Sequence, residues 1–181
     1  KHIPVTKDMI KTTHKGTLKQ ILATRHYNFS KEQFETEILF VGGSTNLNYN
    51  GTYFSGDLSG ITTGTQPRWF QNFTLPGPQI RSIVSWENKL QEIVDKAKQW
   101  DVGFICGVPA WIQILFERII KHYNLKTIHD IWPNLAIYVH GGVAIHPYKK
   151  SIDALCHKPL IYLDTYMASE GFVAYQERPN E

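Results

Sequence analysis

The chain has 181 residues, of which 42% are hydrophobic, 13% aromatic and 19% charged, and its formal net charge is +3. This balance is typical of one globular domain with its own core and excludes a disordered chain. The low charge and scattered basic residues argue against a nucleic-acid partner, and no apolar run approaches the roughly 18 residues of a membrane span.

The first helix is expected to begin after Thr6. Pro4 biases Ile3 towards extended backbone, so residues 1–6 should not be helical. Thr6 is a favourable N-cap, and Asp8 in the first turn suits the positive end of a helix dipole. The apolar spacing that follows predicts about five helical turns.

The first buried strand is predicted at residues 37–41, and it runs into Gly42, Gly43 and Ser44. Neither a dinucleotide-binding glycine motif nor a P-loop follows it. Residues 46–64 are rich in Gly, Asn, Ser and Thr, which predicts an irregular loop. Its apolar residues are candidates either for contact with an acyl chain or for ordinary loop packing; they are Phe54, Leu58 and Ile61.

The second half of the chain repeats the order strand, glycine turn, helix. Strands are predicted at residues 102–107, 135–139 and 160–163, and helices at residues 86–97, 110–123 and 147–155. Ser85 and Pro109 are suited to begin the first two helices. We interpret the helix at residues 86–97 as purely structural.

This order predicts an α/β fold with a largely parallel sheet flanked by helices, formed by residues 1–181 as a single domain. Ligands of open α/β sheets bind beyond the carboxyl ends of the strands. Two such ends carry glycines that let a ligand approach the backbone closely. One is the Gly42-Gly43 pair, and the other is Gly141-Gly142, followed by Val143.

The last strand is expected to deliver three functional side chains to this edge. Tyr166 can stack on a base, Ser169 can donate to a phosphate oxygen, and Glu170 can bind Mg²⁺. The alternative is an ordinary surface Ser-Glu pair at a strand end.

Five segments, in chain order, resemble the acyl-acid amido synthetases of the Gretchen Hagen (auxin-responsive promoter) family, which belongs to the adenylate-forming superfamily. They are Lys1 with Ile3-Pro4 and Thr6, Gly42-Gly43-Ser44, Gly107-Val108-Pro109, Gly141-Gly142-Val143, and Tyr166-Met167-Ala168-Ser169-Glu170-Gly171. The resemblance implies part of the large N-terminal domain of an adenylate-forming enzyme. It also implies ATP and Mg²⁺ as cofactors, and a small carboxylic acid and an amine or amino acid as substrates.

The resemblance also implies residue roles. Ser169 would contact the α-phosphate and Glu170 would bind Mg²⁺, as the catalytic pair. The cofactor-binding residues would be Lys1, Gly141, Gly142, Val143, Tyr166 and Ser169. The chain departs from the family pattern at Met167 and Ala168, where a small residue and a serine are common.

The family's phosphate loop before the lysine, its ribose-binding aspartate and its C-terminal lid domain have no counterpart in this sequence. We therefore expect the chain to be an internal fragment of a larger enzyme, inactive by itself.

Two other functions are open. The chain could be a non-catalytic module that binds a nucleotide or an acyl ligand. It could also be a metal-dependent hydrolase built on His140, His146, His157 and Asp164, although their spacing matches no established zinc pattern.

Cys106 and Cys156 lie in apolar segments, which predicts packed, reduced thiols and a cytoplasmic location. We expect no nucleic-acid and no membrane partner.

Overall fold

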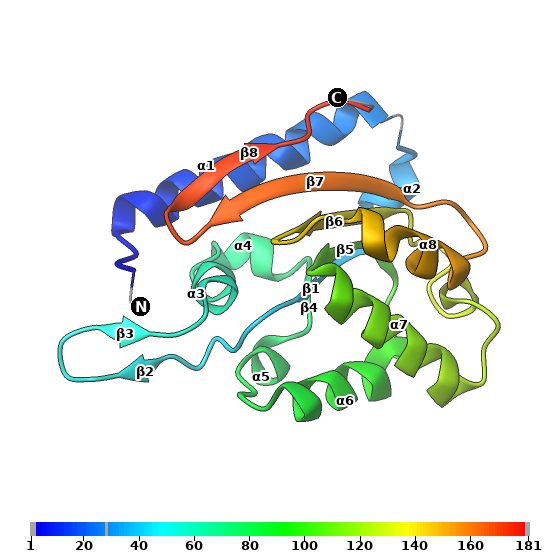
Figure 1. Cartoon of the computed structure of the whole chain (residues 1–181), viewed down its shortest axis with the longest axis horizontal. Helices are drawn as coiled ribbons and strands as arrows, with labels where there is room; N and C mark the ends of the chain where they lie inside the picture. The colour runs from blue at the N-terminus through cyan, green and yellow to red at the C-terminus, as the bar shows by residue number, and fades with distance from the viewer. Residues whose placement is uncertain (1–2, 28, 180–181) are drawn as a thin grey trace.

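A computed structural model describes residues 3–27 and 29–179 of the chain. Lys1, one of the expected nucleotide-binding residues, lies outside this range. The fold is α/β, as predicted, with a six-stranded, mostly parallel sheet between helices (Figure 1). No helix in the described part of the chain is both long and apolar enough to cross a membrane.

The main sheet has the strand order β4-β1-β5-β6-β7-β8. Its strands are β1 (Glu37–Val41), β4 (Thr74–Leu75), β5 (Val102–Gly107), β6 (Ile137–Gly141), β7 (Ile161–Ala168) and β8 (Gly171–Tyr175). A separate hairpin consists of β2 (Asn48–Tyr49) and β3 (Phe54–Ser55).

The helices surround this sheet. They are α1 (Lys7–Ala23), α2 (Lys31–Phe34), α3 (Leu58–Gly64), α4 (Arg68–Gln71), α5 (Pro78–Arg81), α6 (Trp86–Lys96), α7 (Pro109–Tyr123) and α8 (His146–Ala154). Three 3₁₀ turns complete the chain: η1 (Thr24–Tyr27), η2 (Ala97–Gln99) and η3 (Ile128–Asp130).

All neighbouring strands from β4 to β7 pair in parallel, and only β8 is antiparallel to its neighbour. Parallel strands share one direction, so the carboxyl ends of β1, β5, β6 and β7 meet at one edge of the sheet. Each connection between successive parallel strands passes through helical segments, as parallel pairing requires.

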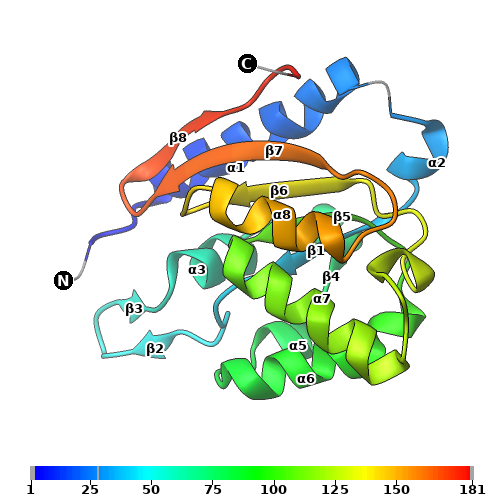
Figure 2. The same cartoon turned by 45° about the vertical axis from the view of Figure 1, so that its right-hand side comes forward.

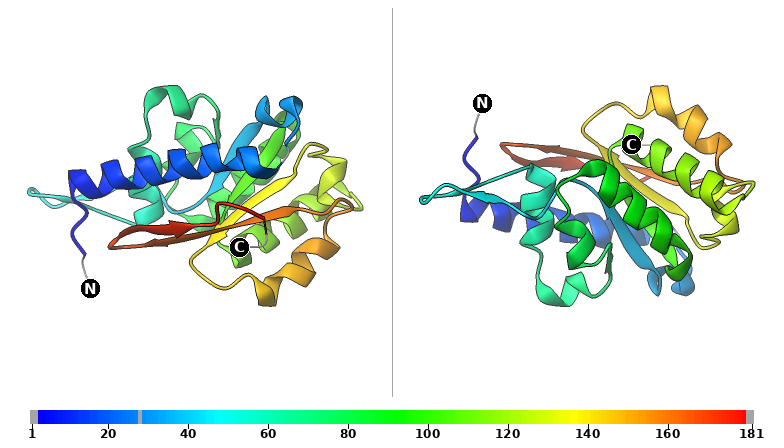
Figure 3. Two further views of the ribbon diagram at one scale, coloured as in Figure 1. Left: turned by 90° about the horizontal axis from the view of Figure 1, so that it is seen from above. Right: turned by 90° about the horizontal axis from the view of Figure 1, so that it is seen from below.

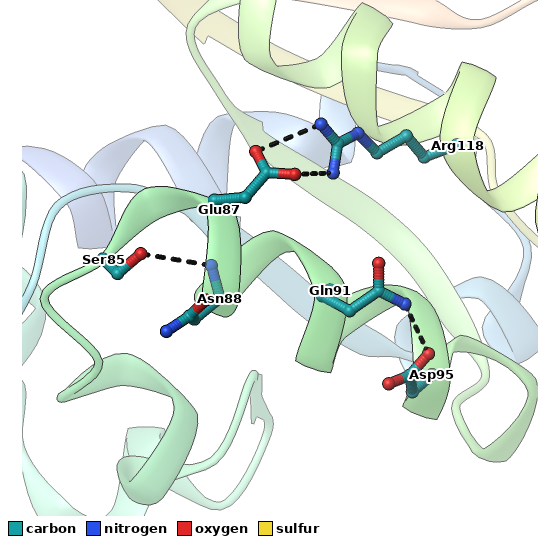
Figure 4. Close-up of polar contacts among 6 residues, drawn as sticks. All are labelled: Ser85, Glu87, Asn88, Gln91, Asp95 and Arg118. Carbon is teal, nitrogen blue, oxygen red and sulfur yellow. Dashed lines mark hydrogen bonds and ion pairs between the residues drawn. The ribbon is translucent and has the colours of Figure 1, made fainter.

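Local sequence signals account for the helix boundaries. The side chain of Thr6 accepts from the backbone N–H of Met9 at 3.2 Å, and α7 begins at Pro109. Figure 4 shows the start of α6, where Ser85 accepts from the N–H of Asn88. These ends are the ones predicted from capping chemistry.

One face of the sheet carries the main core. The helices α6, α7 and α8 cover this face, whereas α1 lies on the opposite face beside β8 (Figure 2). The largest fully buried side chain, Trp132, donates its indole N–H to the carbonyl of Ala97 at 2.9 Å. A paired indole lets this bulky ring be buried without losing a hydrogen bond. On the surface, Glu87 of α6 pairs with Arg118 of α7 (Figure 4).

The prediction for the last strand was too short. Instead of ending at residue 163, β7 continues to Ala168, turns at Ser169 and Glu170, and returns as β8. The extra residues are stabilised by antiparallel pairing with β8, a partner that the local pattern does not reveal. Tyr166 therefore lies within the strand rather than in a loop after it.

Two other boundaries differ from the prediction. The strand expected at residues 135–139 is β6, which begins at Ile137, because the N–H of Leu135 donates to Trp132 in a turn. The segment at residues 46–64, expected to be irregular, forms the β2–β3 hairpin and α3.

Gly141 permits close contact between β6 and β7, and this contact is testable. A Cβ atom at this position would overlap the backbone carbonyl of Thr165. We predict that Gly141→Ala lowers the free energy of unfolding by about 1–3 kcal/mol, the usual cost of overpacking. Urea denaturation measures this value. Gly77→Ala is the control, because its Cβ would make only an ordinary contact; equal losses in the two variants would contradict the explanation.

Candidate functional site

Glycines gather at the carboxyl edge of the parallel strands. β1 is followed by Gly42, β5 ends at Gly107, and β6 ends at Gly141. A Cβ on Gly107 would lie 2.9 Å from the carbonyl oxygen of Val41, so at this position the glycine is needed for strand packing. The glycines therefore have a structural role whether or not a ligand binds there.

The register of β6 and β7 brings two predicted site segments together. Gly141 pairs with Thr165 at the end of the ladder, so Gly142 and Tyr166 each directly follow a residue of the last pair. Gly142 has a φ of 82°, a left-handed conformation that favours glycine. The side chains of Tyr166 and Val143 are 61% and 48% exposed, so both are accessible to a ligand.

Ser169 and Glu170 lie farther out, in the turn of the β7–β8 hairpin. This hairpin extends beyond the end of β6 (Figure 1). Ser169 is four residues beyond Thr165, which corresponds to about 13 Å along an extended strand. Gly141, Gly142 and Tyr166 thus lie at one end of the β6–β7 ladder, and the proposed phosphate and Mg²⁺ ligands lie farther along β7, in the hairpin turn.

The backbone after β1 is already engaged by neighbouring elements. The N–H of Gly43 donates to the Ser59 hydroxyl at 2.9 Å, and the Ser44 hydroxyl donates to the carbonyl of Ser82 at 2.9 Å. Gly60 of α3 packs so closely that a Cβ would overlap the carbonyl of Ser44. This glycine-containing turn is fixed against α3.

A buried lysine at this edge was missed in the sequence. Lys89 of α6 is 3% exposed, and its ammonium donates to the carbonyl of Gly42 at 3.2 Å. Burial lowers its pKa, and the negative charge of Asp57 opposes this shift. The sequence did contain a signal for this burial: Lys89 lies three residues after Trp86 and four before Ile93, which places it on the apolar stripe of the helix.

His140 is a second buried ionisable group beside the glycine pair. It is 4% exposed, and its Nδ1 lies 3.6 Å from a carboxylate oxygen of Asp164 without a hydrogen bond to any described residue. Burial lowers the pKa of His140, Asp164 opposes the shift, and His146 adds to it. The imidazole is therefore held mainly neutral, against the rings of Tyr138 and Tyr162.

The four residues considered for a metal hydrolase do not form one cluster. The ring of His157 lies 4.8 Å from that of His129, in contact with a different part of the chain from the His140–Asp164 pair. Within residues 3–27 and 29–179, no three His, Cys, Asp or Glu side chains are grouped so that they could hold a metal ion.

The proposed acyl-contact residues are also divided. Phe54 is 64% exposed on the β2–β3 hairpin, 4.8 Å from the ring of Tyr49, and the hairpin projects away from the sheet (Figure 3). Leu58 and Ile61 are half-buried on α3. A pocket of about 200 Å³ lies elsewhere, between α1 and the end of β8, and none of the predicted site residues lines it.

Comparison of the chain with protein-family models, with curated proteins and with solved structures gives no match. The geometry described above is therefore the basis for the function proposed below.

The buried histidines predict a pH dependence of stability. His140 and His129 are both buried and both have a pKa lowered chiefly by burial. A lowered native pKa means that the unfolded chain takes up protons first, so this stability is present above about pH 6.5 and is lost as the pH falls towards the native value.

We predict that the free energy of unfolding decreases between about pH 7.5 and about pH 5.5, and that the decrease is smaller in His140→Gln and His129→Gln. Urea denaturation at each pH measures this. A slope in both variants as steep as that of the wild type would contradict the assignment.

Proposed function

We propose that this chain forms the adenosine-binding part of an ATP-dependent, AMP-forming acyl-acid amido synthetase related to the Gretchen Hagen family. The observation that carries the proposal is the register that pairs Gly141 with Thr165, so that Gly142 and the exposed Tyr166 directly follow the last pair of the ladder. Ligands of open α/β sheets bind at this edge, a glycine backbone admits close approach, and an exposed tyrosine can stack on adenine.

The proposed reaction has two steps. A carboxylate oxygen of the acid attacks the α-phosphorus of ATP, the bond to the β-phosphate breaks, and pyrophosphate leaves. The amine then attacks the acyl carbon, AMP leaves with the bond electrons, and the amine loses a proton to give the amide. Neither step needs covalent participation by the protein, so positioning and neutralisation of charge supply the catalysis.

The proposal assigns each candidate residue to one part of the nucleotide. Tyr166 stacks on adenine, and Gly141, Gly142 and Val143 lie along the nucleotide. Ser169 and Glu170 contact the α-phosphate and Mg²⁺, so the nucleotide extends along the outer part of β7 towards the hairpin turn.

The substrates would be a small carboxylic acid and an amine or amino acid. We propose the cytoplasm as the location, because Cys106 and Cys156 are both free and unpaired thiols suit a reducing compartment.

A non-catalytic nucleotide-binding module is the second candidate. One observation favours it: the N–H of Gly43 already donates to Ser59, and the Ser44 hydroxyl is engaged by Ser82. These groups are therefore not free to bind phosphate at the end of β1. Such a module would retain the adenosine contacts without the chemistry.

Nucleotide binding tests the proposal directly. We predict that the chain binds Mg·ATP in calorimetry, and that Tyr166→Ala weakens binding about 5- to 150-fold, since a stacked base contributes roughly 1–3 kcal/mol. Tyr53→Ala, another exposed tyrosine, on the chain between β2 and β3, is the control and should bind as the wild type does. Glu170→Gln should weaken binding of Mg·ATP more than binding of metal-free ATP.

Failure of the wild type to bind ATP or AMP, or equal effects of Tyr166→Ala and Tyr53→Ala, would overturn the proposal. Binding of ATP by this chain fits both candidates, because the chain is expected to be inactive by itself. Pyrophosphate exchange with varied carboxylic acids is therefore measured on the longer protein of which the chain is proposed to form a part. Exchange by that protein supports the synthetase, whereas binding without exchange supports the non-catalytic module.

A further inference from the structure

Helix α1 carries a row of lysines on its exposed side. Lys7, Lys11, Lys15 and Lys19 follow at four-residue intervals, and all four are exposed. Such spacing keeps side chains on one side of a helix, here over about 18 Å. Within the described residues no carboxylate forms an ion pair with this lysine row. The row is a strip of uncompensated positive charge.

The lysine row runs beside an open edge of the sheet. β8 is the last strand, and its course follows α1: Gly16 faces the ring of Phe172, and Lys19 and Tyr175 line the same pocket. Figure 3 (left) shows the helix and the strand lying side by side.

Among the described residues, no strand pairs with the outer side of β8. The N–H of Gln176 donates to the carbonyl of Asp164 at 2.9 Å. Hydrogen bonding alternates along an antiparallel pair, so the N–H and C=O of the preceding residue, Tyr175, point away from β7. An exposed edge of this kind is a template for strand addition.

The opposite edge of the sheet is closed. There the N–H of Ile38 donates to Phe73, so the next carbonyl, that of Thr74, points outwards. This carbonyl accepts from the guanidinium of Arg81 at 2.7 Å, and Arg81 is 6% exposed. The chain thus blocks one edge with a buried arginine and leaves β8 open beside the lysine row.

The lining of a pocket at the end of β8 indicates which kind of partner would bind there. Its volume is about 200 Å³, and it is lined by Lys19, Leu22, Ala23, Arg25, Tyr175 and Glu177. Leu22 is 59% exposed at its mouth. Leu22 and Ala23 give the pocket an apolar side, and its two cations, Lys19 and Arg25, outnumber its one carboxylate, Glu177. Such a lining suits an apolar side chain that is flanked by carboxylates. A nucleic-acid backbone offers no such side chain, and a flat lipid surface does not enter a pocket.

We infer that the free edge of β8, the lysine row and this pocket together form a docking site for an acidic, extended segment of a partner protein. The segment adds a strand to β8, inserts an apolar side chain beside Leu22 and places carboxylates near Lys15 and Lys19. Main-chain hydrogen bonds supply affinity, and charge supplies selectivity. This inference does not depend on the proposed synthetase activity.

The test uses the fluorescein-labelled heptapeptide Val-Glu-Val-Phe-Val-Glu-Val. In an extended strand its phenylalanine and both glutamates point to the same face. Fluorescence anisotropy should show saturable binding to the 181-residue chain. Binding should weaken as NaCl rises from about 50 to about 300 mM, because salt screens exposed charges. The double variant Lys15→Glu/Lys19→Glu should weaken it about tenfold or more.

Two controls separate charge from strand addition. Lys98→Glu/Lys121→Glu makes the same charge change at exposed positions away from β8, and it should bind the peptide within about twofold of the wild type. A peptide with alternate backbone nitrogens methylated keeps every side chain but loses the hydrogen-bond donors along one edge. Its binding should be weaker by about tenfold or more. Circular dichroism confirms that each variant is folded.

The absence of saturable binding, equal binding of a peptide with lysine in place of glutamate, or full binding of the methylated peptide would each overturn the inference. Phosphatidylserine vesicles and a labelled oligothymidylate are tested in parallel. If either binds through Lys15 and Lys19 while the acidic peptide does not, the surface serves a lipid or a nucleic acid and the inference is wrong.

Discussion

The parallel ladder between β6 and β7 is the constraint on which the other features depend. It joins residues 137–141 to residues 161–165 in an uninterrupted register, and it closes tightly because Gly141 has no side chain. A shift of one residue would turn every side chain of β7 to the other face of the sheet. Tyr162 would then leave the face where α8 supplies the carboxylate of Asp153 for its hydroxyl and the ammonium of Lys149 for its ring.

The two faces of the sheet are buried unequally. On the face covered by α6, α7 and α8, side chains such as Leu39 and Ile105 are fully buried. On the other face, Phe104 is half-buried and is covered by the aromatic rings of Phe29 and Phe34. Most of the hydrophobic stabilisation therefore belongs to the first face, at roughly 1.5–3 kcal/mol for each fully buried large side chain.

The sequence was sufficient for features that depend on local chemistry. Thr6, Ser85 and Pro109 mark helix starts because capping and the fixed φ of proline act within one turn, and Asn124 ends α7 in the left-handed conformation. The alternation of strands and helices was enough to predict a largely parallel sheet.

Features that depend on distant partners were not predictable in the same way. β7 is extended by β8, and the two-residue strand β4 exists because it pairs with β1. The buried ammonium of Lys89 is paired with the carbonyl of Gly42, just after β1. The regular spacing of lysines was visible in the sequence, but the exposed side of α1 is fixed only when Gly16 packs against Phe172. Likewise, Glu170 is separated from Gly142 by the β7–β8 hairpin, which the local sequence does not predict.

The two cysteines of the folded chain should have a low reactivity. Loss of solvation raises the pKa of Cys106 and of Cys156 to about 12. At neutral pH only roughly one thiol in a hundred thousand is then ionised, and the thiolate is the reactive form. Both cysteines are half-buried, Cys106 in β5 and Cys156 after α8, so alkylating reagents should modify them slowly because the thiolate is scarce rather than because access is closed.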